Sequence, residues 1–174
     1  MINEKVEKAL NEQINAELYS SYLYLSMSAD FEDKNFEGFA SWMKAQAAEE
    51  LIHAMKIFDY VNERGGKVTL EMIKAPKASW DSPLNAFTKA YEHERKVTKM
   101  INDLVDLSRS ENDHATENFL IWFVDEQVEE EATADSIVSK LKMVEGAKGA
   151  IYMLDKELGS RKPLFSLQTG EEGE

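Results

Sequence analysis

The stretch that decides the fold is residues 43–57, MKAQAAEELIHAMKI. Steps of three or four residues through it follow one face of an α-helix: Met43, Gln46, Glu50, His53 and Ile57. Apolar residues bound this face, so it should turn toward a protein core. Buried carboxylates are rare unless they are paired or bound to metal. The segment therefore predicts a long helix whose buried polar groups need a partner.

Residues that break helices divide the rest of the chain. Gly65-Gly66 ends the helix just described, and Asp81-Ser82-Pro83 is typical of a helix start because polar caps precede a proline in the first turn. Polar turns at 33–35 and 110–113 separate the other long segments, each of which has an apolar stripe. Helices are expected over about residues 3–32, 36–64, 83–109, 114–145 and 150–158.

One connection is much longer than the others. Residues 67–82 lack a helical period, and when extended they reach about 53 Å, more than the roughly 42 Å of a 28-residue helix. We therefore predict an all-α fold: a four-helix bundle with a long crossover between helices 2 and 3 and a short fifth C-terminal helix. Residues 1–159 should form this domain, and residues 160–174 an acidic, disordered tail.

Composition excludes several classes of function. The 174 residues include 33 acidic and 20 basic side chains, a net charge of −13, and no cysteine. Disulfides, Cys-ligated metal centres and thiol catalysis are therefore excluded. The negative charge argues against nucleic acid or an anionic membrane as partner and favours cations. No long apolar run or signal peptide is present, so we expect a cytoplasmic location.

Each of the other long helices also places one glutamate on its apolar stripe: Glu17, Glu94 and Glu130. The first turn lies halfway between Glu17 and Glu50, and the second turn halfway between Glu94 and Glu130. In antiparallel helices, residues equidistant from a turn lie level, so these carboxylates and His53 should meet near mid-bundle. Two divalent cations would balance the negative charge, and oxygen ligands with one imidazole favour iron or manganese.

Five stretches carry a resemblance to a known family: 11–13 (NEQ), 16–20 (AELYS), 49–55 (EELIHAM), 91–94 (YEHE) and 125–131 (DEQVEEE). Over about residues 3–158 the chain is similar to ferritins, specifically the non-haem ferritins of bacteria and archaea. The resemblance implies that Glu17, Glu50 and His53 bind a first iron. Glu50 would bridge to a second iron, which Glu94 and Glu130 also bind.

The same resemblance implies roles for residues around this di-iron centre. Gln127 would hydrogen-bond metal-bound oxygen or water, and Tyr24 would supply an electron, although an ordinary core tyrosine is the alternative reading. A third iron site would use Glu49, Glu126 and Glu129. Haem is not expected, because Leu51 follows Glu50 where haem-binding relatives have a methionine.

The function implied is iron storage and detoxification. A ferroxidase would oxidise Fe²⁺ to Fe³⁺ with O₂ or H₂O₂ and store ferric mineral in a hollow homo-oligomeric shell of twenty-four subunits, with the fifth helix at a symmetry axis. Two alternatives stay open. One is a di-iron oxidase acting on another substrate, and the other is a non-catalytic acidic helical scaffold that binds partners through its surface.

Overall fold

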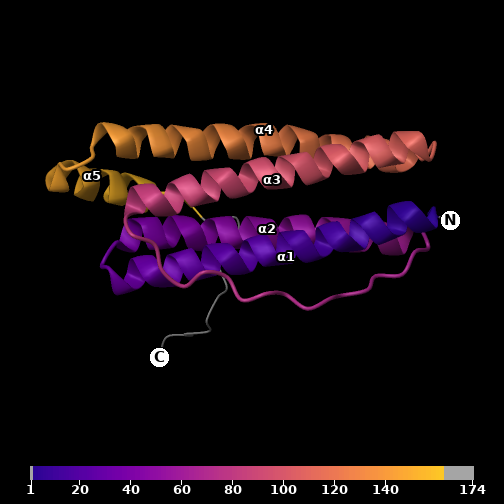
Figure 1. Cartoon of the computed structure of the whole chain (residues 1–174), viewed down its shortest axis with the longest axis horizontal. Coiled ribbons are helices and arrows are strands. Elements are labelled where there is room, and N and C mark those ends of the chain that lie inside the picture. The colour runs from indigo at the N-terminus through magenta and orange to yellow at the C-terminus, as the bar shows by residue number, and fades with distance from the viewer. Residues whose placement is uncertain (1, 163–174) are drawn as a thin grey trace, which may run out of the picture.

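Figure 1 shows the computed structural model of the chain, which describes residues 2–162, as a bundle of long helices. The helices are α1 (Glu4–Asp33), α2 (Glu37–Glu63), α3 (Pro83–Ser110), α4 (His114–Met143) and α5 (Lys148–Leu158). The described residues contain no strand. The predicted all-α fold is thus confirmed, with α4 ending slightly earlier and α5 beginning slightly earlier than expected. Of the predicted tail, residues 160–162 are described and 163–174 lie outside the described residues.

The helix ends follow from local backbone chemistry. The turns after α1 and α3 each contain an asparagine with positive φ, 61° at Asn35 and 55° at Asn112. Asparagine tolerates this left-handed conformation better than most residues. At the helix starts, the side chains of Ser82 and Asp113 accept hydrogen bonds from backbone amides in the first turn. The left-handed asparagines of both turns, with the Asp113 cap at the start of α4, explain why the breaker residues located both hairpins correctly.

The long crossover returns the chain along the outside of α1, as Figure 1 shows. Near one end, Asn11 of α1 donates to the Lys67 carbonyl oxygen at 2.9 Å and accepts from the Thr69 amide at 2.8 Å. Near the other end, the Ser26 hydroxyl donates to the Lys77 carbonyl oxygen at 2.7 Å. The crossover therefore joins opposite ends of the bundle, so α3 starts at the end where α1 finishes.

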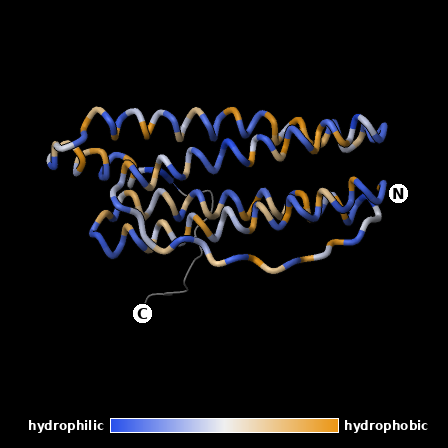
Figure 2. Tube along the Cα trace, viewed as in Figure 1, coloured by the Kyte–Doolittle hydropathy of each residue, from blue (hydrophilic) through white to orange (hydrophobic). Residues whose placement is uncertain are grey.

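Two apolar clusters fill the bundle, one toward each end. Hydrophobic residues recur along each helix in Figure 2, as the predicted stripes require. One cluster includes Val6, Leu10, Ile57 and Phe123. The other includes Met27, Phe31, Phe39 and Phe87. The glutamates of the stripes lie between the clusters in sequence on every helix, so a polar layer divides the core. Among the described helices, none combines the length and apolar character that crossing a membrane requires.

The short helix α5 folds back against the start of α2. The Asp155 carboxylate accepts hydrogen bonds from the Gly38 amide at 3.2 Å and the Phe39 amide at 2.8 Å. A negative side chain is favourable there because it meets unpaired N–H groups at a helix N-terminus. A Cβ atom at Gly38 would lie 1.8 Å from the Asp155 carbonyl oxygen, so only glycine allows this approach. The packing brings Arg161, which follows α5, against α2.

Candidate functional site

The polar layer contains a cluster of buried ligand atoms. Residues Glu17 and Glu50 are each 1% exposed, and residues Glu94 and His53 are 2% and 5% exposed. One ligand atom each of Glu17, Glu50 and His53 lie within 4.8 Å of one another. This spacing suits a single metal ion. We call the buried cluster of Glu17, Glu50, His53 and Glu94 the inner centre.

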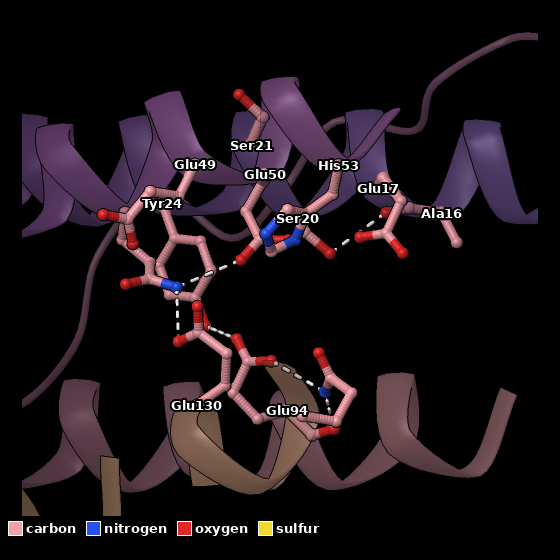
Figure 3. A network of polar contacts seen from close by, with 12 residues as sticks. Ala16, Glu17, Ser20, Ser21, Tyr24, Glu49, Glu50, His53, Glu94 and Glu130 are labelled. Carbon is pink, nitrogen blue, oxygen red and sulfur yellow. Dashed lines mark hydrogen bonds and ion pairs between the residues drawn. The ribbon is translucent and has the colours of Figure 1, made fainter. Parts of the chain in front are cut away.

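All four long helices contribute to this layer, as Figure 3 shows: Glu17 and Tyr24 from α1, Glu50 and His53 from α2, Glu94 from α3 and Glu130 from α4. The carboxylates of Glu94 and Glu130 point toward those of the opposite helix pair. Glu130 is half-buried. It forms a second group of possible metal ligands with His53 and Glu126, and one ligand atom of each of these three residues lies within 4.8 Å of the other two. His53 therefore belongs to both groups.

Neutral donors hold the carboxylates of the inner centre. The Gln13 amide donates to Glu17 Oε1 at 2.7 Å. The Gln46 amide donates to both Glu50 Oε1, at 3.1 Å, and Glu130 Oε2, at 2.8 Å. Glu17 Oε2 is buried without any hydrogen-bond partner. A buried, unpaired carboxylate oxygen is unfavourable by itself, and it fits a group that awaits a cation.

Burial changes the acidity of these groups. Loss of solvation, together with the negative charge of the neighbouring Glu50, raises the pKa of Glu17 to about 8. Loss of solvation also raises the pKa of Glu50 well above its usual value and those of Glu94 and Glu130 to about 7. At neutral pH the metal-free layer therefore retains protons, and its charge is less negative than four carboxylates suggest. A metal ion must displace these protons as it binds.

Gln127 and Tyr24 both contact Glu94. The Gln127 amide donates to the Glu94 carboxylate at 3.3 Å and to Thr98 Oγ1 at 3.2 Å. The buried Tyr24 hydroxyl donates to the other Glu94 oxygen, and burial beside Glu94 raises the pKa of Tyr24 above its usual value. The two donors orient Glu94 within the layer.

A second, more accessible group of acidic residues lies beside the inner centre. A surface cavity of about 330 Å³ is lined by Glu49, Glu126, Glu129, Glu130, His53 and Arg161. We call it the outer pocket. Glu49 and Glu126 are half-buried, whereas Glu129 is exposed. Glu49, Glu126 and Glu129, for which the family resemblance implies a third iron site, therefore line one cavity. This cavity adjoins the inner centre through His53 and Glu130.

Three polar residues that donate to carboxylates of the site were not among the predicted site residues: Gln13, Gln46 and Arg161. Gln46 lies on the same stripe as Glu50, so a buried amide four residues from a buried carboxylate was a usable signal. Arg161 reaches the outer pocket from beyond α5, and no helical period marks it. The sequence interpretation therefore missed it. His93 packs between Tyr19 and Tyr24, and His114 is exposed, so neither joins the ligand groups.

Comparisons with known proteins agree on one family. A family profile described as the ferritin-like domain matches residues 7–144. A bacterial non-heme ferritin of Bacteroides fragilis is 49% identical over 161 residues, which cover 92% of this chain and 100% of that protein. A probable bacterial non-heme ferritin-like protein of Haemophilus influenzae is 43% identical over 161 residues, which cover 92% of this chain and 97% of that protein. Among solved structures, an open pore ferritin from the hyperthermophilic archaeon Archaeoglobus fulgidus superposes with a TM-score of 0.92. Its sequence is 54% identical, and the match covers 93% of this chain and 100% of that chain.

Proposed function

The chain belongs to the ferritin family and is an iron-storage protein, and from that premise we propose that its inner centre is a ferroxidase site. The observation that carries the proposal is the buried, unpaired oxygen of Glu17 beside Glu50 and His53. An oxygen-rich cluster with one imidazole suits Fe²⁺ and Fe³⁺, which prefer harder ligands than thiolate. The cluster lies within one chain, so no partner subunit is needed to complete it.

Two irons would share this layer. Glu17, Glu50 and His53 bind the first iron, since one atom from each can reach a single ion. Glu94 and Glu130 bind the second iron, with Glu50 bridging, because their carboxylates point from α3 and α4 toward α2. Gln46 holds Glu50 and Glu130 on facing helices through one amide, which keeps the two halves of the site at a fixed spacing.

The chain's own residues support oxidation in two ways. Carboxylates stabilise Fe³⁺ more than Fe²⁺, so they favour loss of one electron from each iron. Two electrons and two protons convert O₂ to H₂O₂, or H₂O₂ to two waters. The protons come from carboxyl groups that release them when iron binds, since their raised pKa values leave them protonated at neutral pH. Tyr24 and Gln127 would keep Glu94 oriented during the step.

Storage requires that oxidised iron leaves the inner centre. The outer pocket, with Glu49, Glu126 and Glu129, adjoins it and is open to solvent, so it would hold a third iron on the way out. Ferric mineral would then grow inside a homo-oligomeric shell of twenty-four chains. Helix α5 would line a symmetry axis of that shell, where its exposed side chains Tyr152 and Met153 would be covered.

The test is Fe²⁺ added in air to the assembled protein, with near-ultraviolet absorbance recording Fe³⁺ formation. We expect Glu50→Ala to slow the initial rate by at least about a hundredfold, because changes outside the ligand set already weaken metal sites about 10- to 100-fold. Glu63→Ala, which removes an exposed carboxylate of the same helix, is the matched control. A wild-type rate in Glu50→Ala would refute the proposed site. Size-exclusion chromatography separates storage, which needs a large shell, from a small oxidase acting on another substrate.

A further inference from the structure

The outer pocket already holds a positive charge from the protein itself. Arg161 follows α5, and its guanidinium donates to the Glu49 carboxylate and, at 2.9 Å, to Gln46 Oε1. The guanidinium also lies over the Trp42 ring, 4.7 Å from the ring centroid. Its side chain is 25% exposed and that of Glu49 is 14% exposed, so the ion pair is partly shielded from water.

These contacts require an arginine. A guanidinium is planar, so it can stack on an indole while its edge donates to two different acceptors. A lysine ammonium carries the same charge but lacks the flat face and the second donor group. The three contacts therefore fix Arg161 at the pocket and distinguish it from a mobile surface cation.

Arg161 is also one side chain away from the inner centre. Its donation to Gln46 Oε1 fixes the orientation of that amide. The amide nitrogen then faces Glu50 and Glu130. A change in the position of Arg161 is thus transmitted through Gln46 to carboxylates on two helices.

We propose that Arg161 is the built-in counter-cation of the outer pocket, and that a metal cation binding at Glu49 must displace it. This inference rests on the proposed cation site of the outer pocket and adds the residue that regulates its affinity. Competition between guanidinium and metal for one carboxylate weakens metal binding there. A metal ion leaving the inner centre is then held only briefly, and the returning guanidinium restores the Gln46 contacts.

The competition can be measured without iron oxidation. Zn²⁺ has no redox chemistry, and equilibrium dialysis of the metal-free, assembled protein counts the ions bound at each free concentration. We call the Zn²⁺ sites that are lost in the Glu49→Gln variant the outer class of sites. We expect Arg161→Gln to tighten this class by about tenfold, corresponding to about 1.4 kcal/mol. Lys162→Gln removes the same charge from the next residue, which is exposed and outside the pocket lining, and should leave the affinity unchanged.

A double-mutant cycle distinguishes competition from a general loss of structure. In a Glu49→Gln background, Arg161→Gln should restore no outer-class Zn²⁺ binding, because the contested carboxylate is gone. Arg161→Lys should restore part of the competition, since the charge remains while the Trp42 and Gln46 contacts weaken. Unchanged outer-class affinity in Arg161→Gln, no outer class in any variant, or an equal effect of Lys162→Gln would overturn the proposal.

Failure of the ferroxidase proposal would be recognised separately. It would appear as the absence of a Glu50-dependent class of Zn²⁺ sites or as a wild-type Fe²⁺ oxidation rate in Glu50→Ala. Neither result changes the outcome of the Arg161–Glu49 cycle, because that cycle is scored on the outer class of Zn²⁺ sites alone. Conversely, an inner centre that functions while the cycle shows no coupling would retain the ferroxidase and exclude the role of Arg161.

Discussion

The inner centre and the outer pocket are neighbours that share His53, yet they stabilise their carboxylates differently. The inner centre is buried, its hydrogen-bond donors are neutral amides and a hydroxyl, and one oxygen of Glu17 has no partner. The outer pocket is open, and Arg161 neutralises Glu49. On the proposals above, metal entering the inner centre would exchange with protons, whereas metal entering the outer pocket would exchange with an arginine. This difference would let one bundle bind iron firmly in one place and release it from the next.

The largest effect on Zn²⁺ affinity should appear when one carboxyl group of the inner centre can no longer ionise. Glu17→Gln keeps the shape of the side chain but removes the group that loses a proton and becomes a carboxylate ligand when a metal ion binds. We expect Zn²⁺ affinity of the inner class to fall by about a hundredfold, since a lost ligand should cost at least as much as a lost supporting contact. The exposed Glu12→Gln on the same helix is the control. Equilibrium dialysis measures both, and equal affinities would show that Glu17 is not a ligand.

The second prediction concerns pH and the stability of the metal-free protein. Burial raises the pKa of Glu17 from 4.5 to about 8, so the folded state holds a proton that the unfolded chain has lost between these values. The folded state binds more protons in this window, and its stability must therefore decrease as pH rises from about 5 to 8. At about 1.4 kcal/mol per pKa unit, partly offset by relaxation, we expect Tm to fall by roughly 5–10 °C.

Calorimetry of the metal-free protein across this range provides the measurement. Saturating Zn²⁺ should flatten the profile, because metal replaces the protons and holds the carboxylates ionised. The variant Glu17→Gln should also show a shallower profile than the wild type, since one of the titrating groups is gone. A metal-free Tm that rises between pH 5 and 8 would contradict the proton-exchange account of the inner centre.

The third prediction tests the outer pocket, where smaller effects are expected. Glu129 is exposed, so water screens its interaction with any bound ion. We expect Glu129→Gln to weaken only the outer class of Zn²⁺ sites, by about threefold, and to leave the initial rate of Fe²⁺ oxidation unchanged. Equilibrium dialysis measures the Zn²⁺ affinity, and stopped-flow absorbance of the same preparation measures the initial rate of Fe²⁺ oxidation. An initial rate lowered as strongly as in Glu50→Ala would mean that the two regions act as one site.

The sequence predicted the inner centre better than the outer pocket for a physical reason. Helical period and breaker residues are local signals, and they place Glu17 level with Glu50 once the turn after α1 is located at Asn35. The position of Arg161 depends instead on how α5 docks, which is set by the contact of Asp155 with the start of α2 at Gly38. That contact joins residues far apart in the chain and has no period. Hydrogen-bond partners such as those of Gln46 likewise emerge only from three-dimensional packing.

The smallest effect is expected at Tyr24, which supports the inner centre without facing the outer pocket. Its hydroxyl donates to Glu94, and this hydrogen bond lowers the pKa of Glu94 against the larger effect of burial, which raises it. Tyr24→Phe removes the donor, so Glu94 should hold its proton more tightly and release it to metal only at higher pH. We expect the pH of half-maximal Zn²⁺ uptake to rise by a few tenths of a unit, with a stability loss of about 1 kcal/mol. Tyr22→Phe, at a half-exposed position on the same helix, should change neither quantity. If Tyr24→Phe left the uptake midpoint in place while slowing Fe²⁺ oxidation, the hydroxyl would act by giving an electron and not by tuning Glu94.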